Sequence, residues 1–332
     1  MRTVDTQPDR AVEIADEAIY RGAARPGTPG GAGSVAGVLT PPAYAVGHPG
    51  DRAYARAECL VDADPDATLR VRVRWLQIAT GQSRGSRPAA SDGGPGRGTT
   101  TAVLDAERTE FVPREVAGDM LLSDLLVARH AQPPTIRGGW SRGWLPHLSA
   151  ARPDPWESGR VDAGRRPVGT MRLSAPAGRR VRMIDRADTT PAGVAWDTWS
   201  AQGELRLSAG LTAAGRRLIR LRAELVNTSG WQPRMDETLQ GFRLGRDGDG
   251  PRERAMRHAL VGAHVIVSTD QGAFVSVTDP PEWAMQTARE CRNDGLWPVV
   301  IDTAGGRSAV LFCPVRLADD PGPAVVRPSA GA

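Results

Sequence analysis

Residues 258–301 decide the fold of this chain, and they read HALVGAHVIVSTDQGAFVSVTDPPEWAMQTARECRNDGLWPVVI. Their apolar residues first alternate with small or polar ones, the period of a β-strand, and later recur at the spacing of a helix. The pattern, extended a few residues upstream, predicts a helix, a strand, a turn and a returning strand, in that order, at residues 252–263, 265–267, 269–272 and 273–277. A second helix and further apolar strands are expected to follow.

The second helix has a predicted start and a predicted end. Asp279 is the expected N-cap, because Pro280 then takes the first helical position and Glu282 can reach back as in a capping box. The helix is expected to end near Gly295, since glycine commonly follows the last helical residue. Two further strands are predicted after it, around a Gly-rich turn, at residues 299–301 and 309–312.

Outside this block, the clearest strand is residues 69–75, in which apolar side chains alternate with arginines. That period of two predicts one buried face and one wet face. A hairpin is predicted over residues 203–226, and short helices over residues 9–21 and 115–130. Strands with interspersed short helices and no regular βα alternation favour the α+β class. We expect a mainly antiparallel β-sheet or sandwich with a few short helices and long Gly/Pro-rich loops.

Gly/Pro-rich stretches set the expected domain organisation. The chain has 38 glycines and 27 prolines, which are clustered rather than evenly spread. We expect a single β-rich globular domain at residues 1–318 and a disordered tail at residues 319–332. Disordered insertions are predicted within the domain, where the composition offers little to bury, near residues 22–40, 82–100 and 131–188.

The composition excludes several classes of enzyme. All 42 residues counted as Lys or Arg are arginines. The chain therefore lacks the lysine of a P-loop, the Schiff-base lysine of a pyridoxal enzyme and the strand lysine of a kinase. The net charge of +4 is small for 332 residues, and the arginines are spread among acidic residues. Nucleic-acid binding is therefore not expected.

The N-terminus and the cysteines indicate the cellular compartment. The first ten residues, MRTVDTQPDR, are polar and acidic with no apolar run behind them, so no signal or transit peptide is expected. No stretch approaches the roughly 20 apolar residues that a membrane-spanning helix needs. Cys59, Cys291 and Cys313 have unrelated spacings and are odd in number, which argues against a disulfide framework. We therefore expect a cytoplasmic protein.

Four residues are the candidates for a metal site: Cys59, Cys291, His258 and His264. None of the cysteines or histidines forms the CxxC, HxxxH or HExxH spacing that a local site demands. The predicted second helix places Cys291 on one apolar face with Ala284, Thr287 and Ala288. A free cysteine on such a face packs as a small hydrophobe. The sequence therefore predicts no cofactor, with nickel or iron at these residues as the alternative.

The nine tryptophans outnumber the three tyrosines and four phenylalanines together. Trp140 and Trp144 lie with Arg137 and Arg142 in one Gly-rich segment, RGGWSRGWLP. Two interpretations are open for them. They attach loops to the core, or they form a contact surface for a protein partner, because Trp and Arg dominate the hot spots of protein interfaces.

Three segments together resemble an uncharacterised protein family that is encoded in gene clusters of the high-affinity, actinobacterial-type uptake NiFe-hydrogenases. Residues 57–79, AECLVDADPDATLRVRVRWLQIA, are similar to a strand of that family. Residues 203–229, GELRLSAGLTAAGRRLIRLRAELVNTS, are similar to its central hairpin, which ends in Asn-Thr. Residues 258–301, with DPPEWA and CRNDGLWPV, carry the most specific resemblance. The three segments follow the family's order.

The chain departs from the family pattern at two places. The Tyr/Arg-rich segment that follows the first helix in the family is replaced by YRGAARPGTPGGAGS, where Tyr20 and Gly22 keep its start. FCPVRLADDPGPAV, which begins at Phe312, stands in place of a longer acidic helical tail. We therefore expect a divergent, C-terminally shortened copy, whose activity is impaired if those segments carry it.

The resemblance implies a part in hydrogenase biogenesis. The expected function is that of a non-catalytic accessory or maturation/assembly factor, which binds a hydrogenase subunit or a maturation protein. No catalytic residues are established for the family, so the resemblance assigns none. The alternative is a metal- or thiol-dependent factor that uses Cys59, Cys291 and histidines to handle nickel, iron or a cluster precursor.

Overall fold

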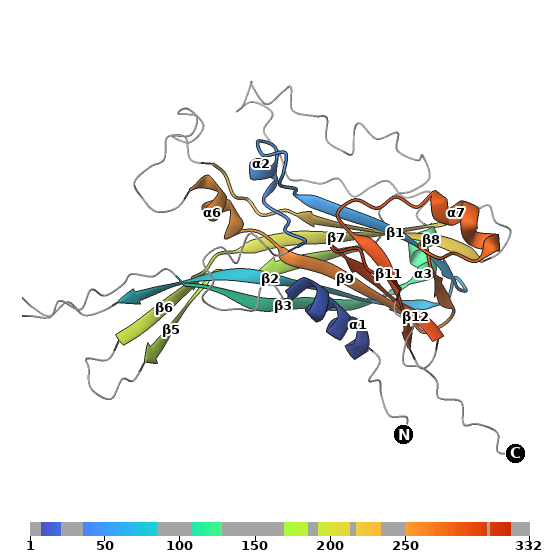
Figure 1. Cartoon of the computed structure of the whole chain (residues 1–332), viewed down its shortest axis with the longest axis horizontal. Coiled ribbons are helices and arrows are strands. Elements are labelled where there is room, and N and C mark those ends of the chain that lie inside the picture. Colours follow the sequence, from blue (N-terminus) through green and yellow to red (C-terminus); the bar gives the residue numbers. More distant parts are fainter. Residues whose placement is uncertain are drawn as a thin grey trace, which may run out of the picture.

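The chain folds into two antiparallel β-sheets that pack face to face, with short helices on their outer surfaces (Figure 1). The computed structural model describes residues 8–20, 36–84, 108–127, 169–184, 192–212, 217–233, 250–303 and 306–319. The α+β class with mainly antiparallel sheet, predicted from the sequence, is confirmed. In the described ranges, no helix has the length and apolar character needed to cross a bilayer.

The first sheet has five strands in the order β10-β1-β8-β7-β4, and every pair in it is antiparallel. Its strands are β1 (Tyr54–Asp62), β4 (Gly169–Ala175), β7 (Ala201–Leu211), β8 (Leu218–Asn227) and β10 (Ala273–Val275). The hairpin predicted over residues 203–226 is the β7–β8 pair beside β1, and that prediction is confirmed.

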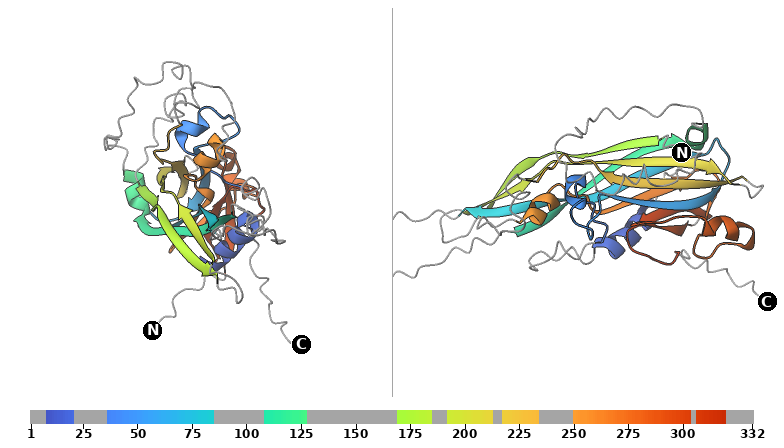
Figure 2. Two further views of the ribbon diagram at one scale, coloured as in Figure 1. Left: turned by 90° about the vertical axis from the view of Figure 1, so that its left-hand side faces the viewer. Right: turned by 90° about the horizontal axis from the view of Figure 1, so that it is seen from above.

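The second sheet has seven strands in the order β11-β12-β9-β2-β6-β5, with β3 on the other side of β2. Its strands are β2 (Thr68–Arg84), β3 (Arg108–Leu121), β5 (Gly178–Ile184), β6 (Ala192–Thr198), β9 (Val261–Thr269), β11 (Trp297–Thr303) and β12 (Gly306–Cys313). Since β2 is longer than β9, its far end pairs with β6 instead. β2, β3, β5 and β6 therefore extend beyond the sandwich at one end (Figure 2).

The core lies between the two sheets. Val71, Val73 and Trp75 of β2 are fully buried in it, together with Leu205 and Leu207 of β7. Burying each such aliphatic side chain favours folding by roughly 1.5–3 kcal/mol. The arginines that alternate with them on β2 lie on the opposite face, as the period of two predicts.

Helices cover parts of both outer faces. α1 (Pro8–Ala15) continues into a π-helical turn (Asp16–Tyr20), and its apolar face packs on the second sheet. The first sheet is covered at one end by a 3-10 turn (Glu282–Ala284) and α7 (Met285–Arg289). The remaining helices are α2 (Pro42–Ala45), α3 (Leu122–Val127) and α6 (Pro251–Met256).

The strand pair predicted at residues 265–277 is wrong as a pair, because its two strands belong to different sheets. β10 pairs with β1, with Val275 opposite Leu60, rather than with β9. Gly272 between them has a φ of +86°, and a Cβ there would collide with the carbonyl oxygen of Asp62. Glycine at this position thus allows the chain to pass close to the end of β1 and change sheets.

The helix predicted over residues 115–130 is wrong in its first half. β3 continues to Leu121, and helix α3 begins only at the next residue. Val116 and Met120 of β3 pack on the core, and β2 offers a pairing partner along this length. Tertiary pairing therefore outweighs the helical propensity of these residues.

All three predicted disordered insertions contain ordered residues, and the one near residues 82–100 begins inside β2, which runs to Arg84. β4 and β5 lie at the end of the insertion predicted near residues 131–188, and Met171 and Leu173 of β4 are buried. Leu39, from the insertion predicted near residues 22–40, is buried and forms a β-bridge with Leu260. Most residues of the predicted insertions lie outside the described residues. The same holds for the tail predicted at residues 319–332, except Asp319, whose Oδ1 accepts from the N–H of Val300 at 2.8 Å.

The helix of the DPPEWA block starts later and ends sooner than predicted. Pro281 is extended with a ψ of 154°, so the first helical turn begins at Glu282 without a side-chain cap. Asp279 is therefore not the N-cap, and its backbone N–H donates to Ser276 Oγ at 2.8 Å. α7 ends at Arg289, and the chain then runs beside β1.

Candidate functional site

Cys59 faces the core from β1 and is fully buried. Burial raises the pKa of its thiol well above 9.0, and the nearby thiol of Cys291 and carboxylate of Glu58 raise it further. Cys313, which ends β12, is also buried, and loss of solvation raises its pKa to about 11. Both thiols therefore remain protonated at neutral pH, whereas the thiolate is the nucleophile and metal ligand.

Cys291 follows α7 and belongs to the face predicted for it. Ala284, Thr287 and Ala288 are buried on that face, and Cys291 packs beside them on the first sheet. Its Sγ lies 3.7 Å from the carbonyl oxygen of Thr287, one helical turn back. The structure therefore places Cys291 in a packing position rather than in an open cleft.

The two candidate histidines lie in different environments. His258, between α6 and β9, is partly exposed, with Nδ1 2.7 Å from the carbonyl oxygen of Ser200. His264 of β9 is fully buried, with Nδ1 2.9 Å from the carbonyl oxygen of Gly262. Burial, with the positive charge of Arg74 opposite it in the sheet, lowers the pKa of His264 to about 4, although the hydrogen bond to Gly262 acts in the other direction. His264 is thus neutral at pH 7.

The structure does not assemble these four candidates into a metal site. Within the described ranges, no three His, Cys, Asp or Glu side chains lie together in a way that could hold a metal ion. Cys59 interacts electrostatically with Cys291 but is on the first sheet, whereas His264 is on the second. The predicted contact residues Trp140, Trp144, Arg137 and Arg142 lie outside the described residues.

The CRNDG segment after α7 locks onto β1. Arg56 and Asp294 exchange two backbone hydrogen bonds of 2.8 and 2.9 Å. The backbone N–H of Glu58 donates to Asn293 Oδ1 at 2.8 Å, and Glu58 Oε2 accepts from the N–H of Arg292 at 3.0 Å. The segment thereby covers the part of the β1 edge that the short β10 leaves open. This half of the motif has a structural role.

The Asn-Thr-Ser end of the central hairpin has a structural role as well. Asn227 is fully buried, and its Nδ2 donates to the carbonyl oxygens of Leu39 at 2.8 Å and His258 at 2.9 Å. Its Oδ1 accepts from the N–H of Ser229 at 2.8 Å. One amide thus joins the N-terminal loop, the end of β8 and the start of the 258–301 block.

The DPPEWAM part of the same 258–301 block presents large apolar side chains to solvent. Trp283 and Met285 are 38% and 37% exposed, and Arg289 beside them is exposed. Arg289 Nη2 lies 3.3 Å from Met285 Sδ. We name Trp283, Met285 and Arg289 the α7 surface. The backbone of the α7 surface is held in place because Ala284 and Ala288 pack on the first sheet.

The α7 surface was not singled out from the sequence, although a signal for it exists. The small residues at 284, 287, 288 and 291 define the buried face, and Trp283 and Met285 lie beside it at 283 and 285. A large aromatic residue off the apolar face of a short helix indicates an exposed side chain.

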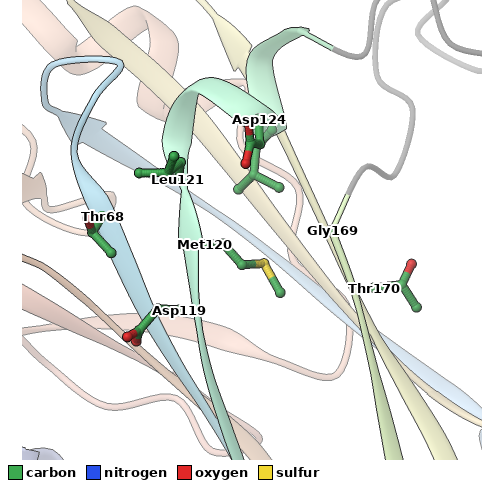
Figure 3. A pocket seen from close by; sticks show the side chains of 8 residues that line it. Thr68, Asp119, Met120, Leu121, Asp124, Gly169 and Thr170 are labelled. Carbon is green, nitrogen blue, oxygen red and sulfur yellow. The ribbon is translucent and has the colours of Figure 1, made fainter.

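A second feature that sequence reasoning missed is a depression at the flank where β3 ends and β4 begins (Figure 3). Its volume is about 530 Å³. Met120 points from β3 toward Gly169, and Asp124 lies above them on α3. It is lined by Thr68, Asp119, Met120, Leu121, Asp124, Leu125, Gly169 and Thr170.

Comparisons with protein-family models, with characterised proteins and with solved structures give no match to this chain.

Proposed function

We propose that this protein is a non-catalytic accessory or assembly factor of NiFe-hydrogenase, which acts by binding a hydrogenase subunit or a maturation protein. The observation that carries the proposal is the α7 surface, where Trp283 and Met285 are exposed within the segment of most specific resemblance. The same segment supplies the scaffold through CRNDG and the surface through DPPEWAM.

The composition of the α7 surface suits a protein contact. Trp, Met and Arg are enriched in interfaces relative to the rest of protein surfaces, and Trp and Arg are the most frequent hot-spot residues. A partner that covers the exposed parts of Trp283 and Met285 would gain the free energy of burying that apolar surface. Because the backbone beneath is held by core packing, little ordering entropy is lost on binding.

The identity of the partner comes from the resemblance alone. A family encoded beside uptake hydrogenases has the hydrogenase subunits and their maturation proteins as its nearest physiological partners. The proposal requires no metal or thiol chemistry from this chain, which is consistent with the burial of Cys59 and the packing of Cys291.

Co-purification tests the proposal. The tagged full-length protein is expressed in a host that makes the hydrogenase, and recovered hydrogenase subunits are quantified by mass spectrometry. We expect recovery with the wild type and a loss of about tenfold or more with the double variant W283A/M285A, since truncating a hot-spot tryptophan costs about 2 kcal/mol or more.

The matched control is Val181→Ala, because Val181 is 60% exposed on β5 at the far end of the molecule (Figure 1). It should leave recovery unchanged. Circular dichroism shows whether each variant keeps its fold. The proposal fails if the double variant recovers as much hydrogenase as the wild type, or if the wild type recovers none and its deletion leaves hydrogen uptake normal.

A further inference from the structure

The flank between β3 and β4 contains two strand edges that no other described strand covers. Among the described strands, β3 pairs with β2 alone and β4 with β7 alone. Such an edge offers backbone N–H and C=O groups to another extended segment. Pro113 interrupts the edge of β3, because proline has no N–H to donate, so residues 114–121 form its continuous part.

Glycines and methionines bring the two sheets close together along this flank. A Cβ at Gly118 would lie 3.1 Å from Met171 Cε, and one at Gly169 would lie 2.7 Å from Met120 Sδ. The depression opens beside these contacts, with Met120 and Leu125 in its lining (Figure 3). The flexible methionine side chain adapts to apolar groups of different shapes.

The rim of the depression is acidic and apolar. Asp119 and Asp124 are exposed, and Leu121 is 45% exposed. Asp119 Oδ1 lies 3.6 Å from Arg70 Nε, but both side chains are more than half exposed, so water and salt screen this pair. The carboxylates therefore remain available to a second cation.

We propose that this flank binds an extended segment of a partner protein in which apolar and basic residues alternate. A segment that pairs with residues 114–121 would direct every second side chain inward, beside Met120 and Leu125. Its other side chains would lie outward, beside Asp119 and Leu121. Directly opposite residues of paired strands have Cβ atoms about 4.5–5.5 Å apart, so an Arg or Lys opposite Asp119 reaches its carboxylate.

This site goes beyond the proposed function, because it uses different residues. α3, at the end of β3, and α7 lie at the same end of the sandwich but on opposite sides of it (Figures 1 and 2). A partner of the α7 surface and a peptide on the β3 flank can therefore be tested separately on the full chain.

Fluorescence anisotropy with a labelled synthetic peptide, Arg-Val-Arg-Val-Arg-Val-Arg, tests the inference. We expect saturable binding to the full chain, and at least about fivefold weaker binding of Arg-Arg-Arg-Arg-Val-Val-Val, which has the same composition without alternation. The double variant D119N/D124N should weaken binding of the alternating peptide by about fivefold or more. Asp66→Asn, at an exposed acidic residue of the β1–β2 turn, should leave it within about twofold.

Each outcome decides for or against the site. Equal binding of the two peptides, or no effect of D119N/D124N beyond that of Asp66→Asn, overturns the proposal. Binding that appears only after residues 132–164 are replaced by a short linker assigns the flank to the chain's own segment and also overturns it. W283A/M285A should leave peptide affinity unchanged, which separates this test from that of the α7 surface.

Discussion

The guanidinium of Arg114 on β3 donates two hydrogen bonds to the side-chain oxygen of Gln77 on β2, from Nε at 2.9 Å and Nη2 at 2.7 Å. Gln77 is fully buried, and its Nε2 donates to the carbonyl oxygens of Pro176 at 3.0 Å and Trp199 at 2.6 Å. Those two residues lie where β4 passes to β5 and β6 passes to β7. The side-chain amide of Gln77 thus holds the β4–β5 and β6–β7 connections, through which the chain passes from one sheet to the other.

Gln77→Leu should destabilise the fold by roughly 2–4 kcal/mol, because it leaves buried donors and acceptors without partners. Urea denaturation followed by circular dichroism measures the free energy of unfolding. The control is Gln202→Leu, at an exposed side chain on β7, which should change it by less than about 0.5 kcal/mol. Equal losses in the two variants would contradict the assigned role of Gln77.

His264 should make the protein less stable as the pH falls from 6.5 toward 4. Its pKa is lowered to about 4 in the folded protein, so between these values the unfolded chain binds a proton that the folded chain does not. The titration of His264 therefore leaves the free energy of unfolding unchanged above pH 6.5. Below pH 6.5 it lowers that free energy progressively, by roughly 3 kcal/mol once the histidine is fully protonated.

The comparison that isolates this effect is the wild type against His264→Gln, by urea denaturation at several values of pH. Carboxylates titrate in both proteins, so the difference between their stability curves reports the histidine. That difference should change with pH below 6.5 and be constant above it. Parallel curves throughout would show that His264 does not titrate as the structure requires.

Gly203→Ala should destabilise the protein by about 1–3 kcal/mol through overpacking. A Cβ there would lie 2.6 Å from Leu260 Cδ1 and 3.0 Å from the backbone oxygen of Val226. Gly230→Ala is the matched control, because nothing lies within 4 Å of a Cβ at that position. Thermal unfolding should show a lower Tm for the first variant and an unchanged or higher Tm for the second; the reverse order would refute the packing described.

The strands that alternate strictly were predictable from the sequence. In residues 69–75 one face is apolar and the other is arginine, and this period fixes β2 without knowledge of its partners. The central hairpin follows for the same reason, whereas β11 and β12 were predictable as continuous apolar runs on either side of a Gly-rich turn. The small-residue face that includes Ala284 and Ala288 was likewise readable from helical spacing alone.

The errors arise where a distant partner decides the structure. β3 is a strand because β2 pairs with it, although Leu121 and its neighbours are good helix formers. β10 leaves β9 for β1, and nothing local in residues 273–275 encodes that choice. The depression near Met120 was equally out of reach, because its lining comes from strands separated in sequence.

The pairing of β1 with β10 also limits how far the protein can fold during its synthesis. Leu60 lies opposite Val275, 275 − 60 = 215 positions further along the chain, and β2 pairs with β9 over a similar span. Contacts between such distant residues form slowly, since a long loop must close first. On the ribosome, both sheets therefore remain incomplete until β9 to β12 have been synthesised, and the apolar strands translated earlier lack these partners in the interval.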